Sequence, residues 1–308
     1  MSKVDILSIP SVDSAHTLYT KVYCPDTEIR GFFQIVHGMA EHIERYDTFM
    51  QKMASEGWIC FGHNHLGHKA SVKNDSELGF IAKRGGDKLL VADVGNVARA
   101  VMEKYSKEAK LPYVLMGHSM GSFTVRLASL ECSPDKLIIM GTGGKNPLAS
   151  IGLALIAIIK FFCGAKHVSK LVDNIAFGTY NDHFDKSRAK EDPSQWLSTD
   201  ESVRQKYYDD KYCGFKFSVS AMGDLIRMIK KSNSDGWYAA LPKDMPILLV
   251  SGSDDPVGNY AAGVHEVENK LRKKDIPTEC VIYGGARHEI LNDFSRENVI
   301  EDILEFVK

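Results

Sequence analysis

Paired cysteines and unbalanced charge are both lacking in this sequence. Its six cysteines are scattered, and no two form the C-x-x-C pair that is typical of zinc knuckles and redox motifs. The chain has 38 Lys and Arg residues against 40 Asp and Glu residues, a formal net charge of −2, and it has no long basic run. Nucleic acid is therefore not an expected partner.

Long hydrophobic runs are also lacking. The most apolar stretch, residues 148–159, is shorter than the about 20 residues that a membrane-spanning helix needs. We therefore expect a buried or interfacial helix there. The first ten residues show no basic start followed by an apolar run, so no signal peptide is indicated. The expected compartment is the cytoplasm.

What the sequence does contain is a regular succession of strands and helices. Helical spacing of apolar residues predicts helices between strands, and a last helix over residues 299–307 with Ser295 as its N-cap. This alternation predicts an α/β fold with a mostly parallel central sheet and helices on both faces. Short apolar runs predict strands at residues 32–36, 58–61, 113–116, 137–140, 247–250 and 281–283.

The alternation stops in the middle of the chain. Residues 146–221 contain an apolar helical stretch, then aromatic and polar turns, then a tyrosine-rich segment. Both flanks follow the strand-helix order. We therefore expect a core made of residues 1–145 and 222–308, with residues 146–221 inserted as a cap over the sheet.

Gly117-His118-Ser119-Met120-Gly121 matches the G-x-S-x-G pattern. The pattern alone is weak, but here it follows a predicted strand and opens a predicted helix, as a nucleophile elbow requires. The serine of such an elbow is held on a sharp turn, and small neighbours let strand and helix approach. We therefore predict that Ser119 is a catalytic nucleophile.

A serine hydroxyl needs a base and an orienting acid, which follow it in the chain in the order acid, then histidine. His288 lies in the loop after the last predicted strand. His265 falls in a helical pattern, His183 precedes the acid, and His118 is part of the elbow. Asp254 and Asp255 both follow residues 247–250; the extended backbone that Pro256 favours at Asp255 suits the role without settling the choice.

The oxyanion of an acyl-transfer reaction also needs backbone donors. In this kind of fold one comes from the residue after the nucleophile and one from the loop after an earlier strand. These positions are Met120 and Met39.

Several of these segments together resemble the monoacylglycerol lipases and lysophospholipases, which are similar to serine aminopeptidases. The shared segments are His37-Gly38-Met39-Ala40-Glu41-His42 with Arg45-Tyr46, the Gly117–Gly121 elbow, Gly252–Asp255 and Gly285–Glu289. The resemblance favours Asp255 as the acid. His65-Leu66-Gly67-His68-Lys69 departs from the family's D-x-R-G-H-G loop, and this puts contacts at the pocket rim in doubt.

The resemblance implies an α/β-hydrolase with a helical cap and no cofactor. It implies that the enzyme acts through an acyl-enzyme and that its substrates are monoacylglycerol-like or lysophospholipid-like esters. The alternatives are hydrolysis of short or aromatic soluble esters, hydrolysis of amides as by an aminopeptidase, and a ligand-binding homologue without turnover.

The cap is where members of this family diverge. Its apolar stretch is consistent with an acyl tunnel, with a lid that touches a membrane surface transiently, or with a helix packed on the core. We expect the substrate pocket to include His37, Gly38, Ile151, Ile156, Phe161 and Phe162.

A metal site is not expected. His63, His65 and His68 lie close together after a predicted strand, but no carboxylate or cysteine completes a recognisable ligand set. A polar structural loop is the simpler interpretation.

Overall fold

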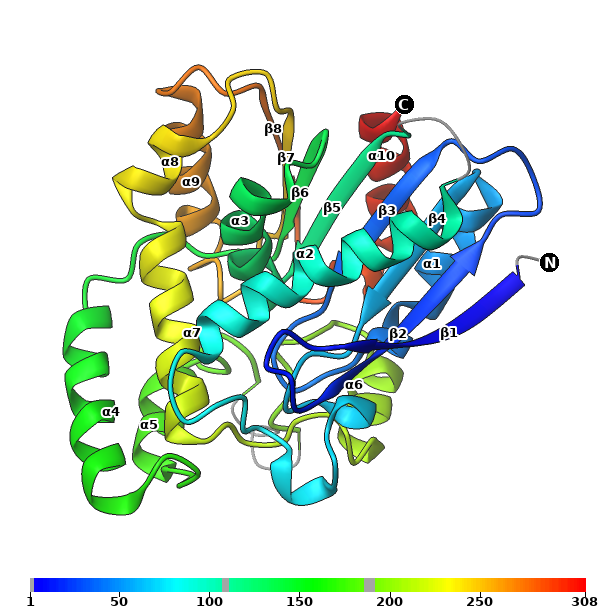
Figure 1. Ribbon diagram of the computed structural model, residues 1–308. Helices are drawn as coiled ribbons and strands as arrows, with labels where there is room; N and C mark the ends of the chain where they lie inside the picture. The colour runs from blue at the N-terminus through cyan, green and yellow to red at the C-terminus, as the bar shows by residue number, and fades with distance from the viewer. Residues whose placement is uncertain (1–2, 107–110, 186–191) are drawn as a thin grey trace.

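The computed structural model describes residues 3–106, 111–185 and 192–308. Within these ranges eight strands form one sheet in the order β1-β2-β4-β3-β5-β6-β7-β8 (Figure 1). The strands are β1 (Lys3–Pro10), β2 (Thr17–Cys24), β3 (Gly31–Val36), β4 (Trp58–His63), β5 (Tyr113–His118), β6 (Lys136–Met140), β7 (Ile247–Gly252) and β8 (Thr278–Tyr283).

The six strands from β4 to β8 along the sheet are parallel, and they are the six that the apolar runs predict. Every residue of β3, β4, β5 and β7 is buried, as expected for strands covered on both faces. The antiparallel strands β1 and β2 were not predicted, because they form the exposed edge and carry alternating rather than continuous apolar residues.

The last helix, predicted over residues 299–307, spans Arg296–Val307. Ser295 is the N-cap residue of this helix, as predicted, but its hydroxyl donates to the Ile290 carbonyl and makes no hydrogen bond to the helix. The α-helices are α1 (Asp47–Ser55), α2 (Gly86–Tyr105), α3 (Met120–Cys132), α4 (Ala149–Cys163), α5 (Lys170–Phe177), α6 (Glu201–Asp209), α7 (Val219–Ser232), α8 (Asp235–Ala240), α9 (Ala262–Arg272) and α10 (Arg296–Val307).

Two hydrophobic cores lie on the two faces of the sheet. Successive strand residues point to opposite faces, so Phe32 joins one core and Phe33 the other. Helices α2, α3, α7 and α9 contribute to the first core, and α1 and α10 to the second (Figure 1). The predicted architecture, a mostly parallel sheet between two layers of helices, is confirmed.

Helices α4, α5 and α6 come between β6 and α7 without an intervening strand in the described part of the chain. Figure 1 shows all three in the lower part of the view, with α4 and α5 near α7 at the left and α6 apart from them toward the right. Helix α7 is continuous across the expected boundary at residues 221 and 222 and packs against both α3 and α4. Among the described residues, no helix has the length and apolar character required to cross a membrane.

Candidate active site

Ser119 lies in the tight connection between β5 and α3. Its backbone has φ 55° and ψ −121°, a conformation that non-glycine residues rarely adopt. A Cβ atom at Gly117 would clash with the Gly121 carbonyl, and one at Gly121 would clash with the Val36 carbonyl. The glycines of G-x-S-x-G are therefore required by the close approach of β3, β5 and α3 around the serine.

His288 and Asp255 lie together in the loops after β8 and β7. His288 Nδ1 and Asp255 Oδ2 are 2.9 Å apart, and both side chains are buried. A Cβ atom at Gly252 would clash with the Ala286 and Arg287 carbonyls, so this glycine lets the two loops approach. Asp254 instead accepts a hydrogen bond from the hydroxyl of Ser253.

The other ring nitrogen of His288, Nε2, is buried and has no hydrogen-bond partner among the described residues. His288 and Ser119 line the same cavity. A histidine that is oriented through Nδ1 by a carboxylate presents Nε2 for proton transfer. Two of the three alternative histidines are placed elsewhere: His265 pairs with Glu268 on α9, and His183 packs against Tyr260.

The loop after β3 lies directly beside Ser119. A Cβ atom at Gly38 would come within 3.0 Å of the Ser119 Cβ, so this glycine gives the loop its close contact with the elbow. Met39 and Met120 line the cavity with Ser119. Met120 is the first residue of α3, and its N–H therefore has no acceptor within the helix.

A buried network joins this loop to the elbow and to His288, and motif spacing did not reveal it. The Glu41 carboxylate accepts hydrogen bonds from the Gly38 N–H at 2.5 Å and the Tyr46 hydroxyl at 2.9 Å. His118 Nδ1 lies 2.9 Å from the Tyr46 hydroxyl, and His118 Nε2 lies 3.2 Å from the His288 carbonyl oxygen. These contacts connect the loop after β3, Tyr46 just before α1, the elbow and the loop after β8.

Charges within this network change the pKa of its members. Burial alone would raise the pKa of Glu41, but hydrogen bonding to His118 and the charge of Arg45 hold it well below its usual value. Burial alone would lower the pKa of His118, but Glu41 raises it. Arg45 also forms two hydrogen bonds with Glu289, the residue after His288. The network therefore holds paired charges in a buried position.

Residues between α5 and α6 also contact His288 and its neighbour. The His288 N–H donates to the Trp196 carbonyl at 3.3 Å, and the Glu289 N–H donates to the Leu197 carbonyl at 2.7 Å. The Trp196 ring packs 5.0 Å from the His288 ring. No sequence motif marks this segment, and the sequence did not indicate its contact with His288.

The cavity beside Ser119 has a volume of about 680 Å³, within the usual range for ligand sites. Its lining is mixed: polar and charged residues such as Asp173 and Lys216 stand with apolar and aromatic ones, which include Phe123, Phe177, Trp196, Leu225 and Val257.

The expected pocket residues are only partly brought to this cavity. Gly38 lines it, whereas His37, Ile151, Ile156, Phe161 and Phe162 do not. Ile156 is buried against α7, and His37 is buried beside other histidines. Ile151, Phe161 and Phe162 point outward and are exposed, so α4 does not form the tunnel that its apolar sequence suggested.

The closely spaced histidines form a buried cluster beside the loop after β3. Burial lowers the pKa of His63 to about 3 and that of His68 to about 4. His68 Nε2 accepts a hydrogen bond from the Ala40 N–H, which a neutral ring can do. His63 has no hydrogen-bond partner for either nitrogen among the described residues. These histidines are thus neutral groups that pack against the loop after β3.

Comparisons with known proteins agree with this arrangement. Residues 27–295 match the family model described as serine aminopeptidase, S33. The monoacylglycerol lipase of Mycolicibacterium smegmatis is 22% identical over 293 residues, covering 93% of this chain and 91% of that protein. The monoglyceride lipase of Homo sapiens is 26% identical over 297 residues, with coverages of 91% and 85%.

Solved structures give the same result. The chain is similar to a thermostable carboxyl esterase from Bacillus coagulans, determined in complex with glycerol. The TM-score is 0.91 and the identity 26%, and the match covers 99% of this chain and 97% of the esterase. Since the family model spans most of the sequence and the sheet has the matching architecture, the chain is an α/β-hydrolase that belongs to the serine aminopeptidase S33 family.

Proposed function

We propose that the chain is a serine carboxylic ester hydrolase that works through an acyl-enzyme. The observation that carries the proposal is the buried 2.9 Å contact between His288 and Asp255, with Ser119 on a strained turn in the wall of the same cavity. Ser119 is the proposed nucleophile, His288 the base and Asp255 the acid that orients it. The Met39 and Met120 amides are the proposed oxyanion donors.

The chemistry follows from these roles. Ser119 Oγ attacks the ester carbonyl while His288 Nε2 takes its proton, and the oxyanion is stabilised by the two amides. The imidazolium then returns the proton to the leaving alcohol, which departs and leaves the acyl-enzyme. Water, deprotonated by His288, attacks the acyl group and releases the acid with Ser119 restored. Asp255 keeps the imidazole in the required tautomer throughout.

The proposed substrates are esters with one acyl chain, such as monoacylglycerols or lysophospholipids. The apolar and aromatic residues in the lining of the cavity that Ser119 also lines suit an acyl chain. The names of the relatives from Mycolicibacterium smegmatis and Homo sapiens support the same class.

A fluorophosphonate probe tests the nucleophile. We expect the folded protein to be labelled once, at Ser119, and the Ser119→Ala variant to remain unlabelled. An exposed serine such as Ser55 at the end of α1, changed to alanine, is a suitable control and leaves the label in place. Labelling of the Ser119→Ala variant, or none in the unaltered protein, would contradict the assignment.

A panel of esters from short to long acyl chains, run beside an amino-acid amide, tests the substrate class. We expect kcat/KM to rise with chain length for glycerol monoesters and to be far lower for the amide. A preference for short or aromatic esters would indicate an esterase of soluble substrates instead. Activity on the amide alone would make it an amidase of the same fold.

We further propose that the cap touches a membrane surface transiently through α4 and α5. Large apolar side chains on these helices are exposed: Ile151, Ile158, Phe161, Phe162, Leu171 and Ile175. An apolar surface of this kind marks an interaction site. Binding to phosphatidylcholine vesicles tests it: a Phe161→Ser/Phe162→Ser variant should bind several-fold more weakly, and a Phe294→Ser variant, exposed in another loop, should bind normally. Equal binding of all three proteins would refute the contact.

A further inference from the structure

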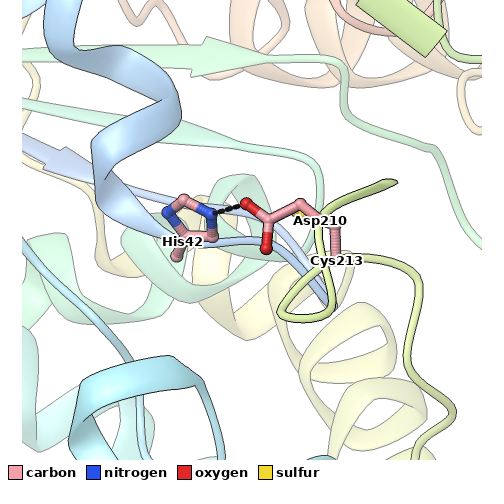
Figure 2. A group of neighbouring side chains, drawn as sticks. All are labelled: His42, Asp210 and Cys213. Atoms are coloured by element: carbon pink, nitrogen blue, oxygen red, sulfur yellow. Dashed lines mark hydrogen bonds and ion pairs between the residues drawn. The ribbon is translucent and has the colours of Figure 1, made fainter. Parts of the chain in front are cut away.

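A second group of side chains lies at the junction between the loop after β3 and the cap. It consists of His42, Asp210 and Cys213 (Figure 2). His42 follows the loop that carries Met39, while Asp210 and Cys213 follow helix α6. The candidate ligand atoms of the three residues all lie within 4.8 Å of one another. Residues about 170 positions apart in the chain are thus brought to one point.

The chemistry of these three side chains suits a particular ion. A thiolate, an imidazole and a carboxylate together form a donor set that favours Zn²⁺ over the harder ions Mg²⁺ and Ca²⁺. Three protein ligands and a water complete a tetrahedral zinc shell. The backbone between Asp210 and Cys213 is closed by a hydrogen bond from the Cys213 N–H to the Asp210 carbonyl, so this turn holds two of the donors together.

The contact between His42 and Asp210 requires only a small adjustment to admit the ion. His42 Nε2 and Asp210 Oδ2 are 2.8 Å apart (Figure 2). Zinc bonds of about 2.0–2.2 Å at a tetrahedral angle separate a nitrogen and an oxygen ligand by about 3.4 Å. The ion would therefore replace the proton in an existing contact. Binding releases that proton and the thiol proton of Cys213.

The surroundings supply the outer contacts that zinc sites have. His42 Nδ1 lies 2.8 Å from Glu44 Oε2, and Glu44 Oε1 lies 2.9 Å from Lys69 Nζ. A carboxylate on the second nitrogen of a ligating histidine fixes its ring and tautomer. The His42 side chain is buried, while that of Asp210 remains 32% exposed and gives the ion a route from solvent.

We propose that His42, Asp210 and Cys213 form a Zn²⁺ site, with Glu44 as the carboxylate that orients His42. The site goes beyond the proposed hydrolysis, which needs no metal. Zinc would fasten the segment after α6 to the loop after β3, which a hydrogen bond from the Gly214 N–H to the Ala40 carbonyl already joins. Cys213 also lines the cavity, so the ion would lie in its wall.

Cobalt is the probe for the test, because Co²⁺ takes the place of Zn²⁺ and its absorption reports a thiolate ligand. The full chain, freed of metal and kept reduced without thiols, is titrated with Co²⁺. We expect a thiolate-to-cobalt charge-transfer band that saturates at one equivalent and disappears when Zn²⁺ is added. Cys213→Ser should abolish the band, and Glu44→Gln should weaken Co²⁺ binding by about 10- to 100-fold.

The control comes from another cluster of potential metal ligands, His265, Glu268 and Cys280. The Cys280→Ser variant should keep the band unchanged. No band in the unaltered protein, a band that persists in Cys213→Ser, or loss of the band in Cys280→Ser would each overturn the proposal. Should Cys213→Ser fail to fold, Asp210→Asn at the more exposed ligand decides: it must weaken Co²⁺ binding at least tenfold.

Discussion

The strand ends beside the cavity and helix α4 of the insert place their side chains in opposite surroundings. At the strand ends, the polar side chains of Asp255, His288 and Glu41 are almost wholly buried. On α4, the large apolar rings of Phe161 and Phe162 are 82% and 78% exposed. Each region therefore reverses the usual partition of polar and apolar residues.

The reversal is stabilised differently in the two regions. A buried charge is tolerated only with partners, and each charge at the strand ends has them within the chain. An exposed apolar side chain does not need a partner for the chain to fold. Among the described residues, none covers the outer surface of α4. Substitution should therefore be costly at the strand ends and nearly neutral for folding on α4.

The largest effect is expected at Asp255. The Asp255→Asn variant keeps the size of the side chain but lets His288 adopt the wrong tautomer, so kcat should fall by about 10⁴-fold. The measurement is ester hydrolysis with folding checked by circular dichroism. Asp254→Asn, in the same loop, is the matched control and should keep most of the activity. Equal losses in the two variants would mean that the acid is wrongly assigned.

The next effect concerns stability. Glu41→Gln removes a buried charge that faces Arg45 and His118, and it should reduce the free energy of unfolding by about 3 kcal/mol. Urea unfolding measures this. Glu56→Gln breaks an exposed pair with Lys52 and should change stability by less than about 1 kcal/mol. A small loss in both variants would show that the Glu41 network does not stabilise the strand ends.

Acid should destabilise the strand ends through the histidine cluster. The pKa of His63 is about 3 in the folded chain and near 6.5 when unfolded, so the unfolded state binds more protons as pH falls below about 6.5. Stability is therefore lost on acidification. At pH 5 this single group contributes about 2 kcal/mol of that loss, and almost none at pH 7.5.

His63→Phe removes this proton uptake. Its stability difference between pH 7.5 and pH 5 should be smaller than that of the unaltered protein by about 2 kcal/mol. Taking the difference between two pH values cancels any packing cost of the ring. The exposed His265, changed to phenylalanine, should leave the difference as it was. An unchanged acid response in His63→Phe would show that this ring is protonated while folded.

Much of the strand-end region could be predicted from sequence because its signals are local. The central strands are continuous apolar runs, Ser119 directly follows β5, and Asp255 and His288 lie in the loops after β7 and β8. The Arg45–Glu289 pair joins residues 244 positions apart, and no local pattern reports it. The proposed zinc ligands could not be predicted for the same reason, because His42 and Asp210 are 168 positions apart in the chain.

The orientation of α4 could not be predicted for a different reason. A helix that is apolar on every side has no polar face to show which way it turns. The sequence therefore indicated the helix but placed Ile151, Phe161 and Phe162 in the pocket, whereas the structure places them on the outside.

The smallest effect is expected on α4 itself. The Phe161→Ser/Phe162→Ser variant should unfold in urea within about 0.5 kcal/mol of the unaltered protein, because neither ring is buried. Phe33→Ala in the sheet core should cost about 3–5 kcal/mol. If the paired serine substitution cost as much as the core one, the rings would be covered by protein in solution. A stable variant that binds vesicles weakly would instead show that the apolar rings of α4 act in binding and not in folding.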